Sequence, residues 1–197
     1  KATLGVDFIS LSAHKIGGPQ GVGALIVSED VAISSHIKGG GQERGRRAGT
    51  ENLPGIAGFG VAGEIAGAFS NVAQVRKLRD RLEASIKKIT PEAVVYGENV
   101  DRLPNTSSIF MPGVKSETQI MKFDLKGIMI SAGSACSSGK VQSSHVLRAM
   151  GVDNDVASNV IRISLGNVNT MDDISYFVQE WKEIYVSANA NKLMEVA

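Results

Sequence analysis

Length, composition and charge already exclude several kinds of protein. The chain has 197 residues, a net charge of +1 and an apolar fraction of 43%, which is typical of an ordinary globular protein. A net charge this small provides no field to steer nucleic acids or anionic lipids. The single cysteine, Cys136, excludes an internal disulfide framework and a cysteine-based zinc site. With no membrane-spanning run and no secretory signal visible, we expect a cytoplasmic protein.

Two apolar runs near the start predict strands at residues 5–11 and 22–28. Both runs are almost continuously apolar, which favours strands covered on both faces, as in an α/β sheet. The glycine-rich connection between them carries Ser12, His14 and Lys15. It therefore presents one lysine among small and polar neighbours.

A lysine in that setting has two interpretations. It is a poor nucleophile at neutral pH because its ordinary pKa is about 10.4. It becomes reactive when a carbonyl cofactor such as pyridoxal phosphate captures it covalently. Ser12 and His14 are available as donors to a phosphate. The alternative is a plain surface lysine on a turn, which is the commoner state of lysine.

A basic loop and a helical region follow. Residues 35–50 are rich in glycine and contain Arg44, Arg46 and Arg47. Without interleaved aromatics this cluster favours a phosphate or carboxylate site over an RNA platform, the alternative being a disordered linker. Residues 52–89 have helical spacing, with a bend or break predicted at 70–71.

After Pro91 short strands and helices alternate, which predicts a small α+β domain. Strands are expected at 94–96, 106–110, 128–130 and 160–165. Helices are expected at 117–125 and 143–150, and from Thr170, as the N-cap, to about Val186. The last helix should bury Ile174, Phe177, Val178, Trp181 and Ile184.

Two residues of this region are candidates for chemistry. Cys136 lies in a polar, glycine-rich segment, where a thiol can be mobile and reactive, although a lone cysteine is often inert. Lys140 and His145 are near enough in sequence to lower the pKa of the thiol. Arg162 stands within a predicted strand, so it is either paired, at a binding site, or on a solvated face.

Three segments together resemble the cysteine desulfurases, pyridoxal-phosphate enzymes of the class V aminotransferase group. Residues 12–23 are similar to the cofactor-lysine segment of that family, 39–52 to its glycine-arginine loop and 131–140 to its active-cysteine loop. The resemblance implies an α/β fold, the C-terminal part of a fold type I PLP-transferase. Residues 1–52 would form the end of the large PLP-binding domain. A connecting helical region would occupy 53–90, and the small α+β C-terminal domain 91–197.

The resemblance also implies the site. Lys15 would bind pyridoxal 5'-phosphate and move protons, and Cys136 would accept sulfur from L-cysteine, leaving L-alanine. Ser12 and His14 would help bind the cofactor, and Thr50 would donate to its phosphate from the neighbouring subunit of a homodimer. Arg162 would bind the substrate carboxylate. The sulfur would pass to an iron–sulfur scaffold or another sulfur-acceptor protein.

Only part of the family pattern lies within these 197 residues. The ring-stacking histidine, the aspartate on the pyridine nitrogen and a phosphate loop precede the lysine in family members. We therefore expect this chain to be an incomplete piece that is inactive alone, with its parent active. Alternatives are a selenocysteine lyase or a class V aminotransferase, and a non-catalytic module that docks a scaffold protein.

Overall fold

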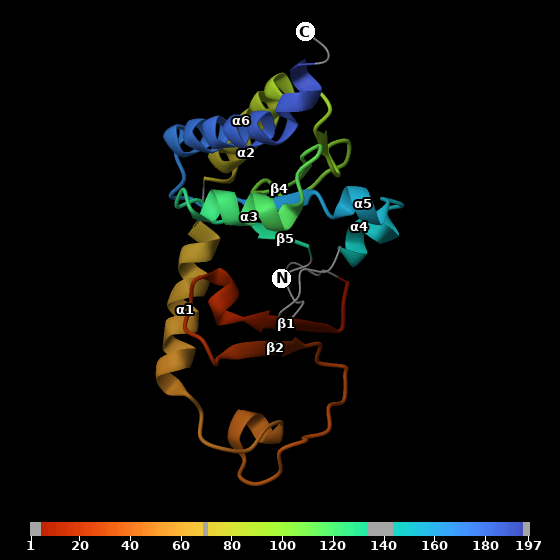
Figure 1. Cartoon of the computed structure of the whole chain (residues 1–197). Helices are drawn as coiled ribbons and strands as arrows, with labels where there is room; N and C mark the ends of the chain where they lie inside the picture. The colour runs from red at the N-terminus through yellow and green to blue at the C-terminus, as the bar shows by residue number, and fades with distance from the viewer. Residues whose placement is uncertain (1–4, 69–70, 134–143, 195–197) are drawn as a thin grey trace. The chain divides into compact units, whose positions relative to one another are not determined.

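A computed structural model describes residues 5–68, 71–133 and 144–194, and the chain divides into two compact units, 1–69 and 70–197 (Figure 1). Among the described residues, no helix combines the length and the apolar character needed to cross a membrane.

The first unit is a β-hairpin packed against one helix. Strand β1 (Phe8–Ser12) leads into the 3-10 turn η1 (Ala13–Ile16) and returns as strand β2 (Gly23–Val27). The strands pair antiparallel, with Ser10 opposite Leu25. A long loop containing a second 3-10 turn, η2 (Gln42–Gly45), then leads to helix α1 (Leu53–Ala68).

The apolar side chains of this hairpin are exposed. Phe8, Leu11, Leu25 and Ile26 each leave between 44% and 57% of their surface accessible. The prediction that both strand faces are covered is therefore wrong within this chain, because only α1 and the turns pack against the hairpin here. Helix α1 is apolar around much of its circumference, with Val61 and Ile65 exposed.

The second unit is a four-stranded antiparallel sheet covered by helices. The sheet order is β3-β4-β6-β5, and each neighbouring pair runs antiparallel. Its strands are β3 (Val94–Val95), β4 (Thr106–Phe110), β5 (Ser131–Ala132) and β6 (Val160–Ser164). Its helices are α2 (Val72–Ile89), α3 (Ser116–Asp124), α4 (His145–Ala149), α5 (Asn154–Ala157) and α6 (Met171–Met194).

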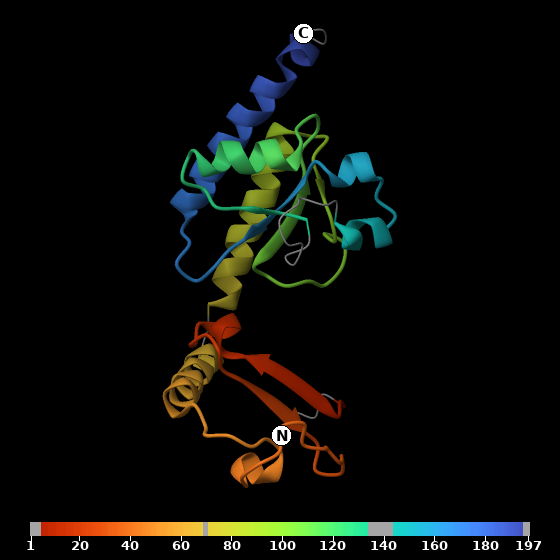
Figure 2. The same ribbon diagram turned by 60° about the horizontal axis from the view of Figure 1, so that its bottom comes forward.

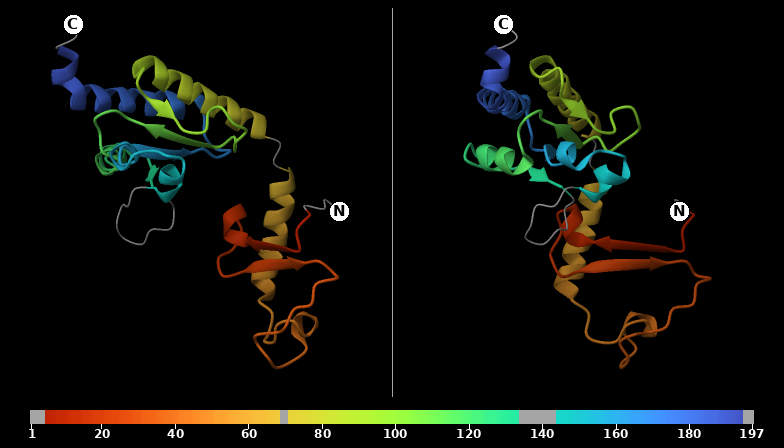
Figure 3. Two further views of the ribbon diagram at one scale, coloured as in Figure 1. Left: turned by 90° about the vertical axis from the view of Figure 1, so that its right-hand side faces the viewer. Right: turned by 45° about the vertical axis from the view of Figure 1, so that its right-hand side comes forward.

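Helices α2 and α6 lie side by side over one face of this sheet (Figures 2 and 3). Trp181, which belongs to α6, is fully buried. Its indole nitrogen donates to Thr90 Oγ1 over 3.1 Å. Phe177 stacks on Phe123 of α3 with ring centroids 4.7 Å apart. The second unit therefore encloses an apolar core of its own.

Several predicted boundaries change. Residues 128–130 are not a strand, because the pairing with β6 falls on Ser131 and Ala132. Helix α6 continues to Met194 instead of ending near Val186, with a non-helical residue at Asn189. The four-residue helix α5 was not predicted. The break expected at 70–71 is confirmed, since α1 and α2 are separate helices.

Candidate active site

Lys15 lies on the turn that joins the two strands of the hairpin. Ala13, at the start of η1, is completely buried and anchors the turn. Its amide donates to the carbonyl of Val22, and its carbonyl accepts from the amide of Gly18. Gly17 closes the turn with φ +85°, a conformation that side chains other than glycine rarely adopt. The lysine is thus held on a short, internally hydrogen-bonded loop.

Helix α1 fixes the position of this turn by close packing. A Cβ added at Gly18 would lie 3.1 Å from the Cβ atoms of Ala13 and Ala62. One added at Gly58 would lie 2.6 Å from Cγ of Pro19. Since real Cβ atoms rarely approach so closely, glycine at position 58 is what allows the turn to rest on the helix.

The functional groups around Lys15 are free. The side chains of Ser12, His14 and Lys15 are exposed, and within the described part of the chain none of them makes a hydrogen bond or ion pair. An amine, a hydroxyl and an imidazole on one short segment are therefore all available to a ligand.

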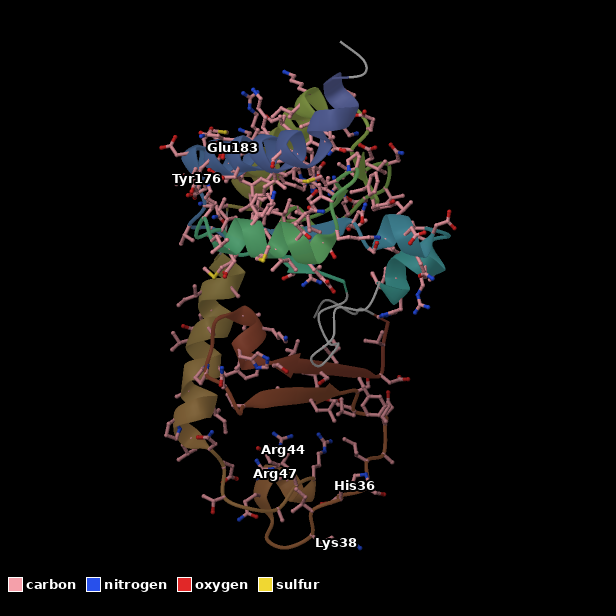
Figure 4. All side chains as sticks on the ribbon, viewed as in Figure 1. His36, Lys38, Arg44, Arg47, Tyr176 and Glu183 are labelled. Atoms are coloured by element: carbon pink, nitrogen blue, oxygen red, sulfur yellow. The ribbon has the colours of Figure 1, made fainter. Side chains whose placement is uncertain are left out.

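A basic loop surrounds a cavity in the same unit. The cavity, of about 720 Å³, lies beside β2 and is lined by His36, Arg44, Arg46 and Arg47, among others. Figure 4 shows Arg44 and Arg47 at η2 and His36 and Lys38 on the preceding loop. Arg47 is held by the carbonyl of Gly49 at 3.0 Å and by Glu43 at 3.8 Å. Thr50 follows this loop and is exposed.

Arg162 lies on a central strand of the second unit. In β6 it is half-buried between the buried Ile161 and Ile163, and it is paired in register with Ser108 of β4 and Ser131 of β5. Its guanidinium has no hydrogen-bond or ion-pair partner among the described residues. Of the three interpretations of Arg162, pairing is not seen among the described residues, and a role at a binding site stays a prediction.

A pocket of about 350 Å³ adjoins Arg162. Its polar lining includes Tyr96, Arg102 and Ser108, and its apolar lining comes from α4 and β6. Burial raises the pKa of the Tyr96 hydroxyl, which keeps this group a hydrogen-bond donor. No aspartate or glutamate is among the described residues that line the pocket.

Cys136 and Lys140 lie outside the described residues. His145 begins α4 and is exposed, and Ser144 caps that helix by accepting from the amide of Leu147. Within the described ranges, no group of three or more His, Cys, Asp or Glu residues is placed to hold a metal ion.

Sequence reasoning missed Tyr96, Arg102 and the acid that pairs with Arg102, Glu83. Arg102 stands in an irregular segment with no periodicity, so nothing in the local pattern marks it. Only the return of the chain through β4 and β6 brings it to the same pocket as Arg162.

The fold is that of part of a fold type I pyridoxal-phosphate transferase, as two solved structures show. The structure is similar to a NifS-like protein of Rickettsia africae, with a TM-score of 0.80 and 42% identity over 92% of this chain and 48% of that one. A second NifS-like protein gives a TM-score of 0.79 at 39% identity, over 91% of this chain and 46% of that one. The aminotransferase class-V family matches residues 2–177, and the chain belongs to this family.

The curated relatives that the chain resembles are cysteine desulfurases. A cysteine desulfurase of Cereibacter sphaeroides is 47% identical over 174 residues, which cover 88% of this chain and 45% of the relative. The cysteine desulfurase IscS of Methanosarcina thermophila is 40% identical over 92% of this chain and 45% of its own length. The chain thus spans a little less than half the length of the curated relatives it matches.

Proposed function

We propose that the protein carrying this sequence is a cysteine desulfurase, which takes sulfur from L-cysteine and releases L-alanine. The observation that carries this proposal is the 47% identity over 174 residues with the desulfurase of Cereibacter sphaeroides. The aminotransferase class-V family model matches residues 2–177, which include both the lysine turn and the strand of Arg162.

The residues of the lysine turn fit pyridoxal phosphate. A covalent bond to the cofactor needs an amine that is not engaged elsewhere, and Lys15 is exposed and unpaired in the described part. A phosphate needs donors, and the free groups of Ser12 and His14 supply them, with Thr50 acting across a homodimer. When bound, the cofactor supplies an electron sink for the substrate carbon. Lys15 would then move protons at Cα and Cβ of the substrate.

Arg162 would bind the substrate carboxylate. A guanidinium offers paired donors in the geometry of a carboxylate, and a bidentate pair fixes orientation as well as position. Arg162 is half-buried and has no partner among the described residues, which supports this role, because a guanidinium shielded from water is costly without an anionic partner.

Cys136 would accept the sulfur. Its thiolate attacks the substrate sulfur, so that an S–S bond forms while the bond from Cβ to sulfur breaks. The electron pair of that bond stays on Cβ, which takes up a proton and becomes the methyl group of alanine. The carbon is reduced as the sulfur is oxidised to the persulfide level, so no external oxidant is needed. The persulfide would then serve an iron–sulfur scaffold or another acceptor in the cytoplasm.

The test is an assay of alanine and protein persulfide formed from L-cysteine by the protein carrying this sequence. Lys15→Ala should abolish both products, whereas Cys136→Ser should abolish the persulfide and the alanine that depends on it. Lys88→Ala, at an exposed lysine in the last turn of α2, is a matched control for Lys15→Ala and is expected to keep activity. Amino-group transfer that is fully retained in the Cys136→Ser variant, in place of alanine and persulfide formation from L-cysteine, would instead favour an aminotransferase. Partner binding with no cofactor and no turnover in the unaltered protein would favour a docking module.

A further inference from the structure

A buried ionic network lies behind the pocket of Arg162. Glu83 of α2 is 8% exposed and accepts from Arg102 Nη2 over 2.7 Å and from Ser107 Oγ over 2.6 Å. Arg102 also donates to the carbonyl of Thr106 over 3.1 Å. The hydrogen bond to Glu83 raises the pKa of Arg102 above its ordinary value, so Arg102 stays charged.

The charges of this network cancel. Arg79 is 5% exposed and donates to Asp80 over 2.7 Å and to the carbonyl of Leu103 over 2.9 Å. Its Nε lies 3.9 Å from Glu83. The two arginines are thus matched by two carboxylates, and Glu83 is the acid that directly contacts Arg102.

Two arginines therefore line one pocket in different electrostatic states. Arg102 has its anion, whereas Arg162 has none among the described residues, and no acid lines the pocket in that part of the chain. Residues 134–143 also contain no aspartate or glutamate. The pocket offers one uncompensated guanidinium where its lining contains two.

We propose that Glu83 determines the anion selectivity of this pocket: by neutralising Arg102 it leaves Arg162 as the single free cation among the described lining residues, so that the pocket accepts a ligand with one carboxylate and discriminates against dicarboxylates. The inference rests on the proposed function, in which Arg162 binds the substrate carboxylate. It goes further, because it holds that Glu83 and Arg102, which do not bind that carboxylate, select the charge of the substrate's side chain. A small, uncharged side chain such as that of cysteine meets this requirement.

The physical basis is charge balance in a partly dehydrated site. A second carboxylate must leave water to enter the pocket, and an engaged guanidinium cannot compensate for that loss. If Glu83 loses its charge, Arg102 becomes an unmatched cation beside the pocket. A second ligand carboxylate then gains a partner at short range, where screening by salt is weakest.

The experiment compares butyrate with succinate, which have the same carbon count and differ by one carboxylate. Both are titrated into the isotopically labelled 197-residue chain, and binding is followed by NMR at the arginine Nε–H signals. In the unaltered chain succinate should bind no tighter than butyrate per carboxylate. In Glu83→Gln, which keeps the shape and one of the two acceptor oxygens, the preference for succinate should rise about tenfold.

Control variants separate this proposal from simple damage to the network. Asp80→Asn removes an acid that pairs with Arg79 and leaves the contact of Glu83 with Arg102 in place, so it should raise the preference for succinate less than Glu83→Gln does. Glu83→Gln combined with Arg102→Gln should restore the original preference. If Glu83→Gln alone does not fold, Arg102→Gln replaces it: the unmatched Glu83 should then weaken butyrate binding about tenfold.

The outcomes distinguish the two claims. Arg162→Gln should abolish binding of both probes, and unchanged butyrate binding would refute the carboxylate role of Arg162 and with it the proposed function of this pocket. If Arg162→Gln abolishes binding but Glu83→Gln leaves the succinate preference unchanged, only the selectivity proposal fails.

Discussion

The two units of the chain bury different kinds of residue. In the second unit Trp181 and Ile161 are completely enclosed, together with large apolar side chains from every layer. In the described part of the first unit, the buried apolar residues are three alanines, Ala13, Ala48 and Ala62. Because apolar burial supplies most of the free energy of folding, about 25 cal/mol per Å², the second unit has the greater stability of its own.

The same contrast applies to the surroundings of Arg162 and of Lys15. Arg162 is placed by the central strand of a closed core, so its position depends on packing that the second unit supplies alone. Lys15 is placed by a turn resting on a single helix, α1, beside strands whose apolar faces are open. The lysine turn is therefore the more sensitive to small changes in packing.

The largest expected effect comes from the core of the second unit. Trp181→Ala should lower its free energy of unfolding by about 3–5 kcal/mol, because it creates a large cavity and leaves Thr90 Oγ1 without its donor. Urea unfolding followed by far-UV circular dichroism measures this loss. Val186→Ala, on an exposed position of the same helix, should change it by no more than about 0.5 kcal/mol. Equal effects from the two variants would contradict the assignment of the core.

An intermediate effect is expected in the first unit. Gly58→Ala should push Pro19 away from α1 and destabilise that contact by about 1–3 kcal/mol. Gly60→Ala lies on the same helix, meets nothing within 4 Å, and should stabilise the helix by about 0.5–1 kcal/mol. Hydrogen exchange of the α1 amides in the 197-residue chain reports both changes. If Gly58→Ala slowed exchange as Gly60→Ala does, the packing of the lysine turn on α1 would be wrong.

The smallest effects are expected at the start of α6. Thr170 accepts from the amide of Asp173 over 3.3 Å, and Asp173 accepts from the amide of Thr170 over 2.8 Å, so the predicted N-cap is confirmed as a reciprocal pair. Thr170→Ala should therefore lower the free energy of unfolding by about 1 kcal/mol, as measured by thermal or urea unfolding.

Asp173, the acid of this cap, makes the stability of the chain depend on pH. The backbone hydrogen bond from Thr170 lowers the pKa of Asp173, so the stabilisation is present above the ordinary carboxyl pKa of about 3.9 and is lost as pH falls through the lowered value. Asp173→Asn should destabilise the chain near neutral pH, and the difference from the unaltered chain should shrink below about pH 4. A difference that stayed constant with pH would exclude the charge of Asp173 as its source.

Sequence patterns predicted the parts of the fold that depend on local periodicity. The buried face of α6 follows from helical spacing. Strand β4 was likewise predicted from a local sequence pattern, at the bounds that it has in the structure. The strand expected at 128–130 failed because register with β6, not strand propensity, selects Ser131 and Ala132. The exposed hairpin could not be predicted, since an apolar run looks the same whether or not something covers it.

The candidate site divides in the same way. Local signals marked Lys15 and Arg162 as candidates, a lysine in a glycine-rich turn and an arginine within an apolar strand, and the family resemblance supplied their predicted roles. The pairing of Arg102 with Glu83 joins residues 19 positions apart across α2 and the loop before β4, and it depends on tertiary packing that no local pattern encodes. Such contacts can be identified only from the tertiary structure, because they form when the sheet is assembled.

The most direct test of the central claim is to locate the cofactor on the protein that carries this sequence. Borohydride reduction converts a lysine–cofactor bond into a stable adduct, which peptide mass spectrometry assigns to one residue. The account predicts a single phosphopyridoxyl group on Lys15, lost in Lys15→Ala together with alanine formation from L-cysteine. Alanine formation by a protein labelled at another lysine, or not labelled at all, would contradict it.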